Sequence, residues 1–470
     1  LLPLTLSGVQ LNADLPIAAG GGGIAVIGDQ VVIGDRLDRF FIYNRQKNIA
    51  RKAKYPPLPS FREEFFSWGK FGRSELFRLH DVEFAETGSK GYLIASHETF
   101  DGEVQSTRLA VHRLEIDPDT LSAIGGWELV FQTRPLPLGD DYFAHGGGGR
   151  LAVYGDFVYL TIGDYNHDGV FLPMSPADPS QAETSDLRWI VRLNIETGAR
   201  EDISFGHRNP QGLTITPNGM VLSTEHGPRG GDELNIIVRG RNYGWPHVSL
   251  GVDYPAYAWP NNKSQGRHEG YEAPVFAWVP SVGVSNLIDI ENFSERWDGD
   301  LLVGSLKAAS LYRLRLNGEK ITYGEPIWIG QRIRDLAQLP DGTIVLWTDQ
   351  TQLLFLTIDS EQLADNKFGG VPVFSTKLDK CFQCHHLGPT NPSHPAPSLS
   401  NIVGRKVASD KQFDKYSTAM KELGGVWSRK RLTMFLTDPA GFAPGNAMAM
   451  EPESDLRHVR KLIDDLELAN

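Results

Sequence analysis

The first three quarters of the chain consist of short apolar runs separated by polar turns. The runs are rich in β-branched and aromatic residues and are flanked by Gly, Asp, Asn or Pro, which is typical of β-strands joined by tight turns. Examples are Gly23–Ile33, Gly91–Ser96, Arg150–Tyr154, Phe157–Ile162, Met220–Thr224, Asp300–Ser305 and Thr343–Thr348. Two turn-and-strand segments, Pro217–Leu222 and Pro340–Val345, resemble each other and indicate a weak internal repeat. Residues 1–365 are therefore predicted to form a β-propeller, although the spacing does not give its number of blades.

The pattern changes after this region. Residues 366–376, which include Gly369-Gly370-Val371-Pro372, are predicted to be a linker. Helical periodicity then appears in Phe413–Leu423, Ser428–Leu436 and Glu453–Leu468. The last of these segments gathers its leucines, valine and isoleucine on one face, as an amphipathic helix does. Residues 377–470 are therefore predicted to form a small α-helical domain.

The charge of the chain limits the classes of partner. The 46 Lys and Arg residues are outnumbered by 58 Asp and Glu residues, which gives a formal net charge of −12. This balance argues against nucleic acid or an anionic membrane surface as a partner. The sequence contains no apolar run long enough for a transmembrane helix. It begins at Leu1 rather than Met, which favours a processed or truncated start without its signal peptide.

Both cysteines of the chain belong to Cys381-Phe382-Gln383-Cys384-His385, the C-x-x-C-H pattern of a c-type haem attachment site. Thiols at this spacing can each reach one haem vinyl group, and the next residue presents its imidazole to the iron. The alternatives are a redox dithiol and half of a zinc site. Only His386 and His394 lie nearby as further zinc ligands, and no βαβ pattern of thioredoxin type surrounds the pair. Covalent haem is assembled outside the cytoplasm, so we expect a periplasmic or secreted protein.

The second axial ligand of the iron must come from the same C-terminal region. The candidates are His386, His394, His458, Met420, Met434, Met448 and Met450. Met420 and Met434 occupy apolar positions of helical patterns, where packing in the core is the default interpretation. Met448 instead lies in a loop, Pro444-Gly445-Asn446-Ala447-Met448.

The C-terminal region, about residues 370–468, resembles the class I cytochromes c. The resemblance rests on C-x-x-C-H followed by Pro397, Leu399, Gly404-Arg405, Phe413, Tyr416-Ser417-Thr418-Ala419, Trp427, Leu432, Phe435-Leu436, Pro439, Pro444-Gly445 and Met448. It implies that Cys381 and Cys384 bind haem covalently and that His385 and Met448 ligate its iron, with Met450 as the alternative ligand. A thioether ligand favours the ferrous state and raises the reduction potential. Because a His/Met pair leaves no open coordination position, this domain is expected to carry electrons rather than bind oxygen.

A second resemblance lies in the β domain. The segments Gly206–Leu213, Thr224–Asn235 and Asn242–Pro246 closely resemble the soluble quinoprotein glucose and aldose sugar dehydrogenases. Judged from their residues alone, these segments are polar and Gly-rich, which suits the close approach of a planar anionic ligand. Members of this family are six-bladed propellers that bind pyrroloquinoline quinone (PQQ) and calcium. The resemblance therefore implies a mainly β protein, a six-bladed β-propeller followed by a small all-α cytochrome c domain, with PQQ, Ca²⁺ and haem c as cofactors.

The same resemblance assigns the site residues. His145, which opens His145–Leu151, matches the general base that takes the substrate hydroxyl proton as hydride passes to PQQ. A histidine beside a glycine run is by itself more often a loop residue, and scattered cations are usually surface charges. The residues implied for PQQ are Lys307, Arg332 and Arg334, which match cations that pair with its carboxylates, and Arg208, Asn209 and Gln211. The backbone carbonyls of Gly227 and Pro228 are the implied calcium ligands.

Two departures from the family concern the substrate. Ala144 stands where glucose-oxidising members place an acid directly before the histidine. Their Gly-rich loop with a substrate-binding Gln is replaced by Phe71–Val82. The cofactor half of the site therefore matches the family, whereas the substrate half is remodelled, and glucose is not assumed.

The sequence thus predicts a PQQ- and calcium-dependent dehydrogenase that oxidises a sugar or alcohol hydroxyl. Electrons would pass from reduced PQQ to the chain's own haem c and then to a soluble or membrane-bound acceptor. The alternative is a non-catalytic propeller that serves as a binding or assembly module for an electron-transfer cytochrome c. Cofactor content discriminates between the two interpretations.

Overall fold

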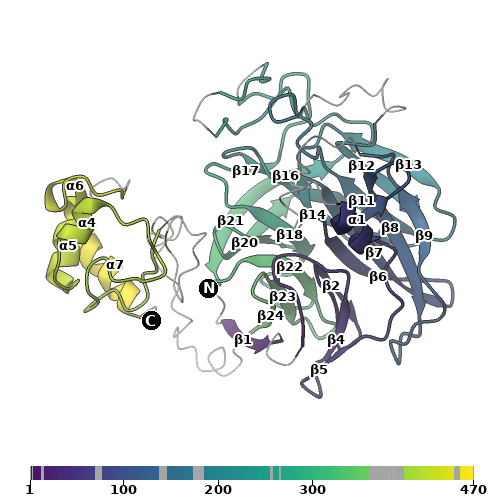
Figure 1. Ribbon diagram of the computed structural model, residues 1–470, viewed down its shortest axis with the longest axis horizontal. Coiled ribbons are helices and arrows are strands. Elements are labelled where there is room, and N and C mark those ends of the chain that lie inside the picture. The colour runs from purple at the N-terminus through teal and green to yellow at the C-terminus, as the bar shows by residue number, and fades with distance from the viewer. Residues whose placement is uncertain are drawn as a thin grey trace. The chain divides into compact units, whose positions relative to one another are not determined.

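The computed structural model describes residues 2, 4–11, 15–68, 77–136, 146–172, 185–254, 258–263, 266–358, 381, 385, 396–448 and 456–468. The chain forms two compact units. One comprises Thr5–Ile327 and Gln331–Thr357, and the other comprises Ile358–Asn470 with Leu1–Leu4 and Trp328–Gly330. The first is a six-bladed propeller and the second is helical, so the predicted fold is confirmed (Figure 1). The predicted linker, 366–376, lies outside the described residues.

The propeller consists of six four-stranded sheets. Five of them use four consecutive strands each, and neighbouring strands pair antiparallel, as β10 does with β11. Their strands are β2 (Gly23–Ile27), β3 (Gln30–Gly34), β4 (Phe40–Asn44) and β5 (Ile49–Lys52); β6 (Leu79–Thr87), β7 (Lys90–Asp101), β8 (Ser106–Ile116) and β9 (Glu128–Gln132); β10 (Gly148–Tyr154), β11 (Phe157–Ile162), β12 (Trp189–Asn194) and β13 (Arg200–Phe205); β14 (Pro210–Ile215), β15 (Val221–Glu225), β16 (Asp232–Ile237) and β17 (Phe276–Trp278); and β18 (Val284–Asp289), β19 (Leu301–Ser305), β20 (Ser310–Asn317) and β21 (Lys320–Trp328).

The sixth sheet closes the ring with both ends of the propeller sequence. It has the order β1-β24-β23-β22, where β1 is Leu4–Gln10, β22 is Ile333–Gln338, β23 is Ile344–Thr348 and β24 is Gln352–Ile358. At the join, the Gln10 Nε2 donates to the Gln350 carbonyl at 2.9 Å. Closure of this kind leaves no exposed inner edge for pairing with another chain.

Two details of the strand pattern become clear in the structure. The apolar run Gly23–Ile33 is a hairpin rather than one strand, because β2 and β3 are joined at Gly28-Asp29 and pair from Ile27–Gln30 outward. The repeated turns Pro217–Leu222 and Pro340–Val345 occupy the same place in their blades, between the first and second strands. The weak repeat in the sequence therefore reflects the repeated blade.

The first strand of each blade contacts the first strand of the next blade around the whole ring. In β6, β10, β14, β18 and β22 a register shift occurs at the same place in this strand. A β-bulge bends a strand and re-aims one side chain. The residues at these bulges include Asp81, Arg150, Asn286 and Asp335, which we call the axial cluster.

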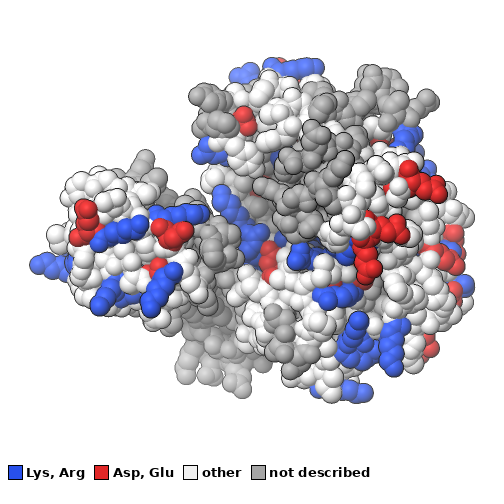
Figure 2. Space-filling model, viewed as in Figure 1, with Lys and Arg blue, Asp and Glu red and all other residues white. Residues whose placement is uncertain are grey.

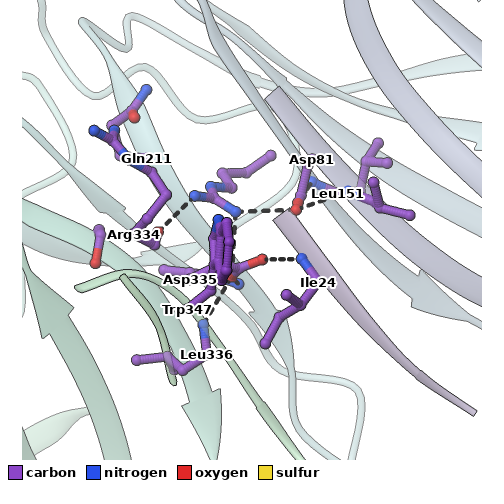
Figure 3. A network of polar contacts seen from close by, with 12 residues as sticks. Ile24, Asp81, Leu151, Gln211, Arg334, Asp335, Leu336 and Trp347 are labelled. Carbon is purple, nitrogen blue, oxygen red and sulfur yellow. Dashed lines mark hydrogen bonds and ion pairs between the residues drawn. The ribbon is translucent and has the colours of Figure 1, made fainter. Parts of the chain in front are cut away.

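The axial cluster is a buried network that ties the inner strands together (Figure 3). Arg150 Nη1 lies 2.9 Å from Asp81 Oδ1 and 3.2 Å from Asp335 Oδ1. Its Nη2 donates to the Arg334 carbonyl at 2.8 Å. Asn286 Nδ2 donates to Asp335 Oδ1 at 2.7 Å. Four inner strands that are distant in sequence are therefore held in one register by charged and polar groups.

The helical unit contains α4 (Thr418–Glu422), α5 (Arg429–Thr437), α6 (Pro439–Phe442) and α7 (Leu456–Leu468). The serine hydroxyls of Ser417 and Ser428 accept from the backbone N–H groups of Met420 and Arg431, as N-cap residues do. The helix predicted over Phe413–Leu423 therefore begins five residues later than the apolar pattern indicated. None of the helices among the described residues is long and apolar enough to span a membrane.

The core of the helical unit is aromatic and aliphatic. Its buried members include Trp427, Phe435, Val459 and Ile463. On the visible face of each unit, Lys and Arg are interspersed with Asp and Glu, as Figure 2 shows.

A single short helix lies among the described residues between the first two blades. It is α1 (Arg62–Trp68), and its Phe65 stacks on Phe77 with ring centroids 4.4 Å apart. This contact holds Phe77, which lies two residues ahead of β6 in the remodelled segment Phe71–Val82.

Candidate active site

The predicted PQQ residues lie at one end of the inner strands. Because each inner strand is the first of its blade, all of them run in the same direction along the propeller axis. The residues that precede the axial cluster therefore lie at a common end. Among them are Asn209 ahead of the bulge in β14, Gln211 within it, and Arg332 and Arg334 around the bulge in β22.

Arg332 and Arg334 both bind Asp349. Arg332 Nε donates to Asp349 Oδ2 at 2.8 Å, and Arg334 donates to both carboxylate oxygens at 2.9 and 3.1 Å. Burial favours the neutral acid, but the two guanidinium groups outweigh it and lower the pKa of Asp349 to about 2. The three residues together keep one net positive charge, so they still attract an anion.

This ion group predicts a stability that depends on pH. The pKa of Asp349 falls from 3.8 to about 2 on folding, so its contribution is present above pH 4 and is lost as the pH falls towards 2. We expect Asp349→Asn to lower the free energy of unfolding by about 2 kcal/mol at pH 7, with a smaller difference below pH 4. Urea unfolding at several pH values checks this, with the exposed Asp119→Asn as the control. A difference that stays constant with pH would contradict the ion-pair explanation.

Lys307 lies beside this group. Arg332 Nη1 donates at 3.3 Å to the carbonyl of Leu306, the residue directly before Lys307. The Lys307 side chain is exposed, and it has no hydrogen bond or ion pair with the described residues. A flexible ammonium group in this position is available to a carboxylate ligand.

Arg208, Asn209 and Gln211 form a second part of the site. Gln211 Nε2 donates to Asn209 Oδ1 at 2.8 Å, and Asn209 Oδ1 also accepts from the backbone N–H of Gly148 at 3.3 Å. The guanidinium of Arg208 lies 5.2 Å from the centre of the Trp245 ring. The Arg208 Nε atom is buried and has no hydrogen-bond partner. A bound group with an acceptor atom would satisfy this donor.

The predicted calcium carbonyls lie in a loop rich in backbone oxygens. A Cβ at Gly227 would clash with the carbonyl oxygens of Gly230 and Gly231. Asp232 fixes this loop because its Oδ1 accepts from the Gly227 N–H at 3.2 Å. The Gly227 carbonyl accepts from Arg208 Nη1 at 3.1 Å and retains a second lone pair. Backbone oxygens are the ligands that a hard cation such as calcium prefers, and here they share the loop with the guanidinium of Arg208.

His145 and Ala144 lie outside the described residues, which resume at Gly146. The glycines that follow have left-handed backbone conformations, with φ of +86° at Gly146 and +87° at Gly149. A Cβ at Gly146 would lie 2.8 Å from Asp164 Oδ1. Burial raises the pKa of Asp164 to about 6 although Arg208 opposes it. The backbone directly after His145 therefore lies beside the carboxyl group of Asp164.

Four polar residues at this end of the propeller escaped the sequence prediction: Arg78, His80, Glu98 and Tyr165. His80 Nε2 lies 2.9 Å from Glu98 Oε1, and the Tyr165 hydroxyl donates to the same oxygen at 2.8 Å. A Cβ at Gly147 would lie 3.1 Å from the Tyr165 hydroxyl oxygen, so the group lies against the glycine segment after His145. Arg78 and His80 belong to the segment Phe71–Val82, whose departure from the family could have pointed to them. Glu98 lies in an ordinary strand pattern that gave no such indication.

In the helical unit, the haem-binding candidates that the structure describes share one core. Cys381 is buried in the hydrophobic cluster, and Met448 packs against that cluster. His385 Nδ1 donates to the Pro397 carbonyl at 2.8 Å, which fixes the ring and leaves Nε2 as the nitrogen for a metal. Burial lowers the pKa of His385, which favours the neutral imidazole needed for ligation. Cys384 and Met450 lie outside the described residues.

Comparison with known proteins covers both units. The model of the glucose/sorbosone dehydrogenase family matches residues 79–356. The chain is 33% identical over 280 residues to aldose sugar dehydrogenase YliI of Escherichia coli, which covers 57% of the chain and 72% of that protein. A structure of the PQQ-bound form of aldose sugar dehydrogenase from Streptomyces coelicolor has the same fold, with a TM-score of 0.54 and 20% identity over 76% of the chain and 100% of that protein.

The helical unit has relatives of its own. Over 72 residues the chain is 46% identical to a cytochrome c homolog of Rickettsia typhi. The match covers 15% of the chain and 41% of that protein. The chain therefore combines an aldose sugar dehydrogenase-like propeller with a cytochrome c-like region.

Proposed function

Because the chain belongs to the glucose/sorbosone dehydrogenase family, we propose that it is a PQQ- and calcium-dependent dehydrogenase that oxidises a sugar or alcohol hydroxyl and delivers the electrons to its own haem c. The observation that carries this proposal is the convergence of the predicted PQQ residues at one end of the inner strands. Arg332 and Arg334 keep a net positive charge there, and Arg208 presents an unsatisfied donor. Anion-binding groups beside the aromatic ring of Trp245 suit a planar tricarboxylate.

The residues of the propeller bind and orient the cofactor. Arg332, Arg334 and Lys307 bind its carboxylates, while Asn209 and Gln211 hold its polar edge. The carbonyls of Gly227 and Pro228 bind calcium. When bound, PQQ supplies a two-electron acceptor and calcium polarises it. The PQQ-bound relative from Streptomyces coelicolor supports this cofactor.

His145 takes the proton of the substrate hydroxyl. An imidazole with a pKa near neutrality suits this task. The glycine segment after it is fixed by the Asn209 side chain, which accepts from the Gly148 N–H, so the chain is anchored to the cofactor site at Gly148.

The helical unit is the outlet for the electrons. Cys381 and Cys384 attach the haem, and His385 and Met448 ligate its iron. Haem supplies the one-electron carrier through which a two-electron cofactor can be reoxidised. The proposal includes a periplasmic or secreted location, because covalent haem is assembled there, and an external acceptor for the electrons.

Reconstitution of the full chain tests this proposal. Addition of PQQ and Ca²⁺ to the haem-loaded protein, followed by a panel of aldoses and alcohols, is expected to reduce the haem in a substrate-dependent way. The double variant Arg332→Gln/Arg334→Gln is expected to lose PQQ binding, whereas the exposed Arg51→Gln retains it. If the wild-type chain binds no PQQ in a calorimetric titration, the non-catalytic alternative replaces this proposal.

A further inference from the structure

The residues Arg78, His80, Glu98 and Tyr165, which we call the Arg78–Glu98 cluster, are not among the residues assigned to the cofactor. Arg78 and Glu98 are neighbours across the β6–β7 edge, since the Glu98 N–H donates to the Arg78 carbonyl at 3.0 Å. The Glu98 side chain is 0% exposed. One of its oxygens, Oε1, accepts from both His80 and Tyr165.

Two polar groups of the cluster lack a hydrogen-bond partner among the described residues: one carboxylate oxygen of Glu98 and the guanidinium of Arg78. Glu98 Oε2 is buried and has no hydrogen-bond partner. The Arg78 guanidinium makes no hydrogen bond or ion pair with the described residues. Burial and the nearby Arg334 together lower the pKa of Arg78 to about 10, although Asp349 and Glu98 oppose the shift. A buried acceptor and a partly buried donor without partners are costly unless a ligand satisfies both.

The cluster lies within the proposed site. On one side, Arg78 is close enough to Arg334 for the two charges to interact. On the other side, His80 fills the space beside Gly149, where a Cβ would lie 2.5 Å from its Cγ. The glycine segment after His145 therefore separates the cluster from Asn209 and Gln211. A substrate held beside this glycine segment and the cofactor residues would meet Arg78 and Glu98.

The chemistry of the two free groups selects the ligand. A guanidinium only donates and a carboxylate only accepts, whereas each hydroxyl of a sugar does both. Two neighbouring hydroxyls can therefore accept from Arg78 and donate to Glu98 Oε2 at the same time. An anionic sugar would be attracted by Arg78 but repelled by Glu98, so a neutral sugar fits best.

We propose that Arg78 and Glu98 form a hydroxyl-binding subsite that selects a neutral sugar with neighbouring hydroxyl groups, with His80 and Tyr165 as positioning residues that hold the Glu98 carboxylate. This inference rests on the proposed function and deepens it. It supplies a substrate half for the site in place of the Gly-rich loop that the sequence lacks.

The test uses the full chain loaded with haem, PQQ and Ca²⁺. Arg78→Gln and Glu98→Gln are compared with Arg51→Gln and Glu103→Gln, two exposed positions on the same propeller. For a neutral aldose, each site variant is expected to raise KM by about 10- to 100-fold, because each removes a hydrogen bond to a charged group. The Kd for PQQ, measured by calorimetry, is expected to stay within about twofold of wild type, and both controls are expected to be unchanged.

A series of deoxy sugars identifies the contact. One of the deoxy sugars is expected to have the same KM with wild type and with Arg78→Gln. That sugar lacks the hydroxyl that Arg78 contacts, so removal of Arg78 costs it nothing further. Arg78→Gln leaves no partner unsatisfied in the protein, so it remains informative if Glu98→Gln fails to fold.

Three results would overturn the subsite. A weaker Kd for PQQ in Arg78→Gln with an unchanged KM would make Arg78 a cofactor ligand. A wild-type preference for sugar acids over neutral sugars would exclude the charge pair as the selector. Unchanged KM in both variants would leave the cluster purely structural. A wild-type chain that binds no PQQ would instead defeat the proposed function, and the subsite with it.

Discussion

Replacement of Arg150 by methionine is expected to lower the free energy of unfolding of the propeller by about 3 to 5 kcal/mol. Arg150 is 2% exposed and pairs with Asp81 and Asp335 at 2.9 and 3.2 Å. Without it, two carboxylates remain in the core with no cation. The Arg334 carbonyl also loses its donor. The loss of one partner from a buried ion group costs far more than a surface pair contributes.

The pH dependence of this variant identifies the cause. Burial already raises the pKa of Asp81 to about 7 against the attraction of Arg150. An acid whose pKa is higher in the folded protein than its unfolded value of 3.8 binds protons more tightly when folded. Stability therefore falls as the pH rises from about 4 to 7. The deficit of Arg150→Met is expected to be smaller at about pH 5 than at about pH 8.

Denaturant unfolding followed by tryptophan fluorescence measures both effects. The exposed Arg51→Met serves as the control, and the triple variant Arg150→Met/Asp81→Asn/Asp335→Asn is expected to recover much of the loss, because no charge is then left buried. An Arg150→Met protein as stable as wild type at pH 8 would show that the axial cluster does not hold the blades together.

Substitution of His145 by alanine is expected to slow substrate-driven haem reduction by about 10²- to 10⁴-fold, the usual contribution of a general base. The backbone that follows His145 is anchored through Gly148 to Asn209, so the alanine variant keeps the cofactor site. The Kd for PQQ is expected to stay within about twofold of wild type. Stopped-flow absorbance of the haem measures the rate, and calorimetry measures PQQ binding.

His145→Asn is the matched variant, since the amide keeps polarity and much of the size but accepts no proton near neutral pH. It is expected to be as slow as His145→Ala. The wild-type rate is expected to change with pH near neutrality as the base titrates, and both variants are expected to lack this change. Full haem reduction by either variant would rule out His145 as the base.

Much of the candidate site was predictable because its motifs are local. The Cys381–His385 spacing follows from covalent chemistry within one turn of backbone, and the segments around Arg208 and Arg334 match a family residue by residue. The axial cluster was less visible. Its members stand before an aliphatic residue in each inner strand, as in Asp81-Val82, Arg150-Leu151 and Asp335-Leu336, but a two-residue repeat is too short to stand out.

The sequence by itself determined the classes of structure and predicted a haem attachment site and a set of cations for the cofactor, because hydrophobic periodicity and short motifs are properties of neighbouring residues. Only the tertiary structure decided which polar groups meet. Glu98 binds His80, 18 positions away, and Tyr165, 67 positions away, while Asp335 meets Arg150 across the axis. Such pairs depend on how six blades close into a ring, and the energy of a buried charge depends on partners that no local pattern specifies.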